Sequence, residues 1–174
     1  FRTEYNDTLT YISNFNFRIP TQFSDLHLSE LKLGDNPGFY FYQFLIKSFI
    51  SNNPQVFILI SAVITNVLIV FFYKKYSVGF GFSIYLFIAS GLYLLGFVAI
   101  KQMLAIAIGL WGIHYFYKNQ HIKFIVVLLI ASTIHPFILL FLSAYLLNDE
   151  VWTRKMMLSF VIVIVIGFVF TQFV

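Results

Sequence analysis

The chain has 174 residues, of which 60% are hydrophobic and only 10% are charged. Soluble domains carry roughly 25% charged residues, so this composition excludes a soluble fold and predicts an integral membrane protein. The absence of cysteine excludes disulfides and thiolate metal sites. The net charge of +4 is small and scattered, which argues against nucleic-acid binding and favours a role in orienting the protein in the bilayer.

A polar segment, residues 1–54, precedes the first long apolar run. Within it, Asn6-Asp7-Thr8 stands before a run containing Tyr11, which predicts a short capped helix lying at the membrane interface. Asp35-Asn36-Pro37-Gly38 predicts a tight turn. The apolar and aromatic stretch Phe39–Ile50 that follows is too short to span a bilayer, so we expect an interfacial or half-inserted helix there.

The rest of the chain, residues 55–174, predicts transmembrane helices joined by short polar connectors. A helix needs about 20 apolar residues to cross a hydrocarbon core of about 30 Å. The predicted helices cover 55–73, 80–100, 102–117, 124–147 and 156–174. The predicted fold class is therefore all-α: a polytopic integral membrane helix bundle with an outer polar N-terminal segment. Because the chain opens without methionine and stops inside an apolar run, we expect further helices on both sides of it.

Charges in the connectors predict an orientation. If the helices alternate as hairpins, four lysines share one side of the membrane: Lys74, Lys75, Lys118 and Lys123. All seven carboxylates and the turn at Lys101 then share the other side. The positive-inside rule places the lysine connectors in the cytoplasm and residues 1–54 outside.

Two polar residues inside the apolar segments are candidates for function. Lys101 interrupts the apolar run Phe80–Tyr117, and charge in hydrocarbon costs roughly 2.5 kcal/mol or more, so it is either an interfacial anchor or part of a site. His135 stands near the middle of 124–147, where Pro136 kinks the helix and frees a carbonyl. An imidazole there either belongs to a site or joins two helices by a hydrogen bond. Position alone leaves both choices open.

Four short motifs occur in order along the chain: Arg2-(four residues)-Asp7-(three)-Tyr11, Asn36-Pro37-Gly38-Phe39, Lys101-Gln102-Met103-Leu104-Ala105 and Ala131-(three)-His135. In this order, and at these membrane positions, they resemble the EpsG/Wzy-like family of bacterial capsular and exopolysaccharide polymerases. The resemblance covers roughly residues 2–147. Two positions depart from the family pattern, because Asn36 stands where an acid is common and Lys101 stands where arginine is common. Lysine keeps the charge but lacks the bidentate fork of arginine.

The resemblance implies glycosyl transfer at the outer face of the bacterial plasma membrane, where the protein would be multi-pass. The implied substrate is an undecaprenyl-diphosphate-linked oligosaccharide, and the implied partners are the lipid bilayer and other polysaccharide-assembly membrane proteins. The departing lipid diphosphate develops negative charge that cations stabilise. Candidate residues for binding the diphosphate or sugar are Arg2, Lys101, Gln102 and Tyr11.

The acceptor hydroxyl also needs a general base. His135 is the first candidate, since histidine titrates near the working pH, and Asp7 is the second. Fixed cations replace a metal in this scheme, so we expect no cofactor.

Three other functions stay open on the sequence. A membrane O-acyltransferase also uses a buried histidine, and a cytoplasmic acyl donor would favour a His135 that is accessible from that side. A flippase or transporter of lipid-linked sugars would use Arg2 and Lys101 to bind an anionic headgroup, and inverted repeats, of which the sequence shows none, would favour it. A structural membrane subunit would need no site at all.

Overall fold

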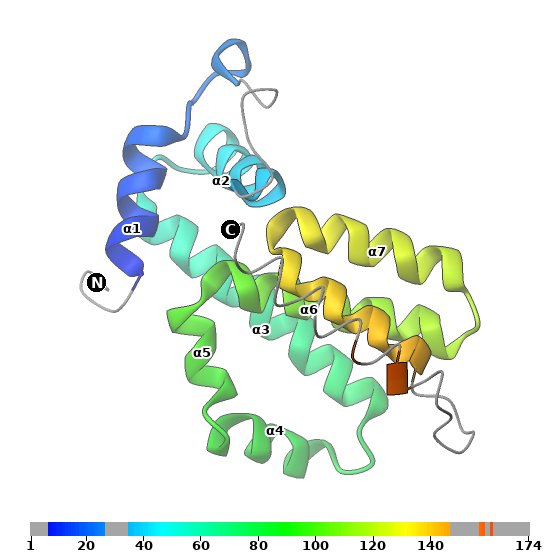
Figure 1. Cartoon of the computed structure of the whole chain (residues 1–174). Coiled ribbons are helices and arrows are strands. Elements are labelled where there is room, and N and C mark those ends of the chain that lie inside the picture. Colours follow the sequence, from blue (N-terminus) through cyan, green and yellow to red (C-terminus); the bar gives the residue numbers. More distant parts are fainter. Residues whose placement is uncertain (1–6, 27–34, 147–156, 159–160, 162–174) are drawn as a thin grey trace.

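A computed structural model describes residues 7–26, 35–146, 157, 158 and 161. In this part of the chain all regular structure is helical, which confirms the predicted all-α class. Figure 1 shows a bundle of long helices with the N-terminal helices gathered at one end. Arg2, the connector 148–155 and nearly all of the predicted helix 156–174 lie outside the described residues.

The N-terminal segment begins with helix α1 (Thr8–Ser13), which continues into the π-helix η1 (Asn14–Arg18). Asp7 occupies the N-cap position of α1, as the sequence predicts, but its side chain makes no capping hydrogen bond. The capping chemistry of the prediction is therefore wrong, and the carboxylate is left for another role. The short 3-10 helix η2 (Phe23–Asp25) follows.

Helix α2 (Pro37–Phe49) starts at the predicted turn. Asn36 precedes it in the left-handed conformation, with φ at 52°, and Pro37 takes the first helical position, where its missing N–H costs no hydrogen bond. Gly38 packs on helix α7 so closely that a Cβ there would lie 2.8 Å from the Cβ of Thr133. The start of α2 is thereby held against the bundle.

Helix α3 (Pro54–Tyr76) is the longest element, about 35 Å at 1.5 Å per residue. The Oδ1 of Asn53 accepts a hydrogen bond from the N–H of Gln55 at 2.9 Å, so this helix has an ordinary side-chain cap. Among the described residues, α3 is the one helix long and apolar enough to cross a membrane by itself.

The predicted helix 80–100 consists of two helices, α4 (Phe80–Ala89) and α5 (Leu92–Val98). They are bent by 54° at Gly91, whose φ of 78° suits glycine and ends α4. Together the pair passes the same length and composition test, as a broken span or a re-entrant loop. The polytopic arrangement therefore stays a prediction.

Helix α6 (Ile100–Tyr117) packs along α7 (His121–Ile134), and the chain reverses between them. Gly109 on α6 allows the close approach of the 3-10 helix η5 (Pro136–Leu146), since a Cβ there would lie 2.7 Å from Cγ1 of Ile138. A Cβ on Gly112 would meet Leu128 of α7 at an ordinary 3.4 Å. The α6–α7 pair is the frame on which the other elements pack.

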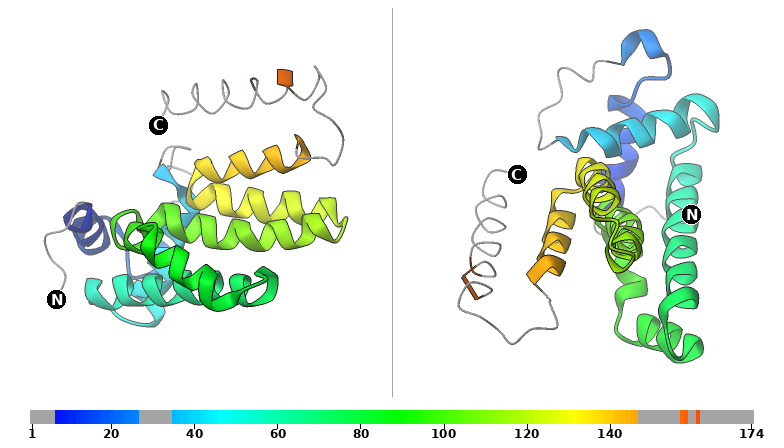
Figure 2. Two further views of the ribbon diagram at one scale, coloured as in Figure 1. Left: turned by 90° about the horizontal axis from the view of Figure 1, so that it is seen from below. Right: turned by 90° about the vertical axis from the view of Figure 1, so that its right-hand side faces the viewer.

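The predicted helix 124–147 is broken at His135. Helix α7 ends at Ile134, and a 3-10 helix, η5 (Pro136–Leu146), runs back beside α6 and α7 (Figures 1 and 2). His135 is extended, with φ −155° and ψ 121°, because the ring of the following proline disfavours the helical conformation. His135 therefore lies at the end of the α6–α7 pair near the start of α2, not in the middle of a span.

The hydrophobic core joins the N-terminal segment to the bundle. Phe15 of η1 is fully buried and stacks on Phe57 of α3 at 5.1 Å between ring centroids. Phe57 in turn contacts Phe39 of α2 edge to face at 6.0 Å. Helices η1 and α2 are thus packed against α3, which gives the polar groups they carry defined positions.

Candidate functional site

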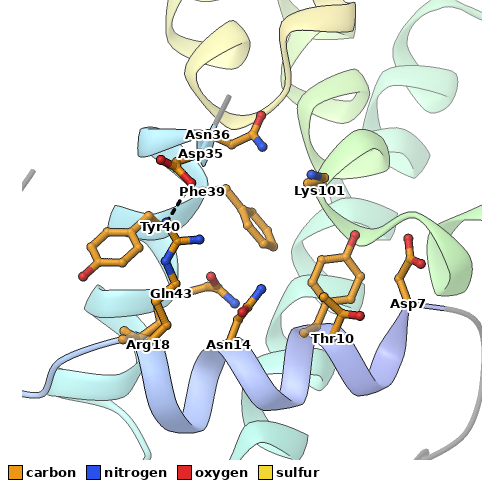
Figure 3. A pocket seen from close by; sticks show the side chains of 12 residues that line it. Asp7, Thr10, Asn14, Arg18, Asp35, Asn36, Phe39, Tyr40, Gln43 and Lys101 are labelled. Atoms are coloured by element: carbon orange, nitrogen blue, oxygen red, sulfur yellow. Dashed lines mark hydrogen bonds and ion pairs between the residues drawn. The ribbon is translucent and has the colours of Figure 1, made fainter. Parts of the chain in front are cut away.

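A polar pocket of about 180 Å³ lies where α1, η1, the start of α2 and the start of α6 meet (Figure 3). Its walls come from segments far apart in the sequence, and it collects charged, amide and aromatic side chains. The lining residues are Asp7, Thr10, Tyr11, Asn14, Arg18, Ile19, Asp35, Asn36, Phe39, Tyr40, Gln43 and Lys101.

Three of the site residues expected from the sequence line this pocket: Asp7, Tyr11 and Lys101. Gln102 is exposed and does not line it. His135 is outside the lining, but it follows the end of α7 at which Thr133 packs on Gly38, at the start of α2. Sequence motifs separated by about a hundred residues are therefore brought to one end of the bundle.

Lys101 and Asp7 stand on the same side of the pocket in Figure 3. Lys101 is half-buried at the first turn of α6, where the sequence predicts a helix to begin. Within the described residues no ion pair of 4.0 Å or less joins Lys101 to any carboxylate, Asp7 included. A cation with no carboxylate partner among the described residues, facing a polar pocket, attracts an anionic ligand.

The opposite side of the pocket contains a neutralised cation. Arg18, at the end of η1, donates to Oδ1 of Asp35 at 2.7 Å, and this pair connects η1 to the turn before α2. Both side chains are partly exposed, so the pair adds little stability. The pair instead neutralises the charge of Arg18, which is therefore less available to an anionic ligand than Lys101.

Lys47 of α2 holds the N-terminal helices in place. Its Nζ donates to the carbonyls of Phe15, Asn16 and Ile19 at 2.6, 3.0 and 2.7 Å. These carbonyls belong to the end of η1 and the residue after it, which would otherwise lack partners. Burial lowers the pKa of Lys47, but the three acceptors suit its ammonium form. The sequence reasoning missed this residue.

Gln43 brings a buried amide into the pocket from the middle of α2. It is 3% exposed, and its Nε2 has no hydrogen-bond partner in the described part of the chain. The sequence reasoning missed it as well, because Phe39–Ile50 reads as an apolar interfacial helix. Its position one helical turn after Phe39 of the turn motif was the available signal.

The ring of His135 has a defined hydrogen bond. The backbone N–H of Phe137 donates to Nδ1 at 3.3 Å. Nδ1 must keep its lone pair to accept this bond, so the neutral ring carries its proton on Nε2 and presents a donor there.

The opposite end of the α6–α7 pair contains His114, in the last turn of α6 beside Trp111. The two rings are in edge-to-face contact at 6.0 Å, and His114 also hydrogen bonds Tyr76. In the described residues no group of three or more His, Cys, Asp or Glu side chains is arranged to hold a metal ion.

The comparison with protein families matches the chain to a family described as the EpsG family, over residues 1–174. The four motifs lie within this match. No curated protein and no solved structure matches the chain. The family suggests a polysaccharide polymerase-type function, a lipid-linked saccharide substrate and a membrane setting.

Proposed function

The chain belongs to the EpsG family, and we propose that it polymerises oligosaccharide repeat units carried on undecaprenyl diphosphate. In this proposal it is a multi-pass protein of the bacterial plasma membrane and joins the units by glycosyl transfer at the outer face. The observation that carries the proposal is the pocket in which Asp7, Tyr11 and Lys101 meet.

Lys101 is the proposed binding group for the diphosphate. The reaction breaks the bond between the anomeric carbon and the diphosphate oxygen, and the electron pair leaves with the lipid diphosphate. A fixed cation stabilises that growing charge better than water does, because it needs no reorganisation during the reaction. Arg2 is the second proposed cation, and Gln102, which is exposed beside Lys101, is proposed to contact the lipid-linked substrate as it enters.

Asp7 is the proposed general base. The acceptor hydroxyl attacks the anomeric carbon, and its proton must pass to a group within hydrogen-bond reach. Asp7 lines the pocket and its carboxylate does not cap α1, so it is available for this transfer. His135 serves as a base only when Nδ1 releases the N–H of Phe137, so its proposed first role is to donate from Nε2 near Lys101.

The position of His135 also bears on the acyltransferase alternative. A cytoplasmic acyl donor would reach a histidine on the side of the lysine connectors. His135 instead follows the end of α7 that packs on the start of α2, away from the connector between α6 and α7. A transporter of lipid-linked sugars keeps one specific observation in its favour. The helix break at His135 is the kind of interrupted helix that transporters use to bind substrate.

Reconstitution of the full-length protein tests the proposal. Wild-type protein in vesicles, supplied with lipid-linked repeat units, should produce a ladder of polymer on a gel. Lys101→Ala should lose the ladder and leave single repeat units on lipid, while Lys118→Ala at the opposite end should keep it. A Lys101-dependent movement of intact repeat units across the vesicle membrane, without new glycosidic bonds, would identify a transporter instead.

A further inference from the structure

Gln43 is a buried amide with an unused donor. Its neighbours Phe39, Phe44 and Ile46 on α2 are apolar and buried. Nε2 has lost water without gaining an acceptor among the described residues, which costs stability. An apolar side chain of similar length would avoid that cost, so packing alone does not account for glutamine here.

The amide lies on the side of the pocket away from Lys101. Figure 3 shows Gln43 and Asn14 on one side, Lys101 and Asp7 on the other, and the ring of Phe39 between them. The two sides differ in charge as well as in position. Gln43 and Asn14 are neutral, whereas the other side has a carboxylate and a cation that do not form an ion pair.

We infer that the Gln43 side of the pocket is a saccharide subsite in which Nε2 donates a hydrogen bond to an oxygen of the sugar next to the diphosphate. The acceptor is a sugar hydroxyl or the carbonyl of an acetamido group, since both offer a neutral lone pair to an amide donor. This inference rests on the proposed function and deepens it, because it orients the substrate with its diphosphate at Lys101 and its first sugar at Gln43.

Three observations favour a sugar over a second phosphate at this side. The amides of Gln43 and Asn14 carry no charge, and Arg18 is paired with Asp35 at 2.7 Å. The ring of Phe39 offers an apolar surface against which a sugar ring can pack. The volume of about 180 Å³ is below the roughly 300–1,000 Å³ of pockets for drug-sized ligands, so one ring fits better than a repeat unit.

Thermal unfolding of the full-length protein without substrate tests whether Gln43 is present for a ligand. Gln43→Met removes the unpaired donor at nearly constant volume, so its melting temperature should equal or exceed that of wild type. A matched control is Gln120→Met, because Gln120 is exposed in the connector before α7. A clear fall in melting temperature for Gln43→Met, or its failure to fold, would show a structural role and overturn the inference.

Polymerisation kinetics provide the second readout. With lipid-linked repeat units as the probe, Gln43→Met should raise KM by roughly two- to tenfold, the effect of one neutral hydrogen bond, and change kcat less. Gln43→Glu should raise KM further if the partner is the acetamido carbonyl, because two acceptor oxygens then face each other. A sugar hydroxyl can instead donate to the carboxylate, so a smaller rise would indicate a hydroxyl. Gln120→Met should match wild type.

De-N-acetylated repeat units distinguish the two acceptors. If the acceptor is the acetamido carbonyl, wild type should lose as much affinity for the de-N-acetylated units as Gln43→Met loses for the natural unit. If the acceptor is a hydroxyl, wild type should still bind the de-N-acetylated units more tightly than Gln43→Met does. A wild-type KM in Gln43→Met, with polymer still lost in Lys101→Ala, would overturn the subsite alone. Failure of the wild type to form polymer would overturn the proposed function and the subsite together.

Discussion

The two ends of the α6–α7 pair contain the same residue types in different surroundings. At the end formed by the two lysine connectors, Nζ of Lys75 lies 5.5 Å from the ring centroid of Trp111, and Nζ of Lys123 lies 5.7 Å from that of Tyr115. At the pocket end, Lys101 is half-buried and has no such ring and no carboxylate within ion-pair distance in the described residues. Lys75 and Lys123 at one end lie against aromatic rings, whereas Lys101 at the other end faces a pocket.

This difference shows that the surroundings of a lysine, rather than its charge, distinguish a membrane anchor from part of a binding site. Lysines over aromatic rings, beside a tryptophan whose Nε1 donates to the carbonyl of Leu68 at 3.2 Å, resemble the aromatic belt at a membrane interface. Lys101 instead shares its pocket with Asp7 and with aromatic and amide groups from three other segments.

The largest effect should come from Asp7→Asn. The change keeps the shape of the side chain and removes its ability to accept a proton, so polymer formation should fall by about 10²–10⁴-fold. Asp7 does not cap α1, so the melting temperature should stay near that of wild type. Asp25→Asn is the matched control, since Asp25 lies in η2 outside the pocket. Wild-type polymer from Asp7→Asn would transfer the role of base to His135.

Lys47→Met should release the N-terminal helices from α2. It removes three hydrogen bonds from an ammonium to the carbonyls at the end of η1, and charged hydrogen bonds contribute about 1.5–3 kcal/mol each when well formed. Hydrogen–deuterium exchange should therefore speed up in α1 and η1 and stay unchanged in α6 and α7. Polymer yield should fall with it, since the pocket depends on that placement. Uniform exchange across the chain would contradict this anchoring role.

Much of the fold was predictable because local chemistry decides it. Asn36-Pro37 and Asn53-Pro54 start helices where a proline suits the first turn, and both starts are observed. Gly109 of α6 leaves room for a neighbouring element, and Ile138 of η5 packs on it. The break at Gly91 was missed, because an apolar run reads as one helix until packing decides where it bends. The kink expected at Pro136 is larger than predicted, since α7 ends at Ile134 and the chain turns back at His135.

The candidate site was predictable in part for the same reason. Asp7, Tyr11 and Lys101 stand out as polar or motif positions in an apolar chain, and they line one pocket. Lys47 did not stand out, because its role depends on hydrogen bonds to carbonyls some 30 positions away in the sequence. Gln43 did not stand out, because its role depends on the lack of a hydrogen-bond partner for Nε2 among the described residues. Such partners are set by tertiary packing, which no local pattern encodes.

Gly38→Ala should disturb the pocket end through packing. The added Cβ would lie 2.8 Å from Cβ and 2.9 Å from the carbonyl carbon of Thr133, so α2 must move away from α7. Overpacking of this kind costs about 1–3 kcal/mol, which thermal or denaturant unfolding would detect. Gly112→Ala is the control on α6, since its Cβ would meet Leu128 at an ordinary 3.4 Å. Equal losses in both variants would remove this contrast between the two positions.

The smallest effect should come from Lys101→Arg, compared with Lys75→Arg. Arginine keeps the charge and adds a fork that suits diphosphate oxygens, so Lys101→Arg should change KM for lipid-linked repeat units within about tenfold while polymer remains long. The direction is informative: a lower KM indicates that the cation contacts the diphosphate through two oxygens, and a higher KM indicates that the pocket is shaped around a single ammonium. Lys75→Arg should leave KM unchanged, because a guanidinium also stacks on the Trp111 ring. Equal responses at the two positions would mean that Lys101, like Lys75, serves as an anchor.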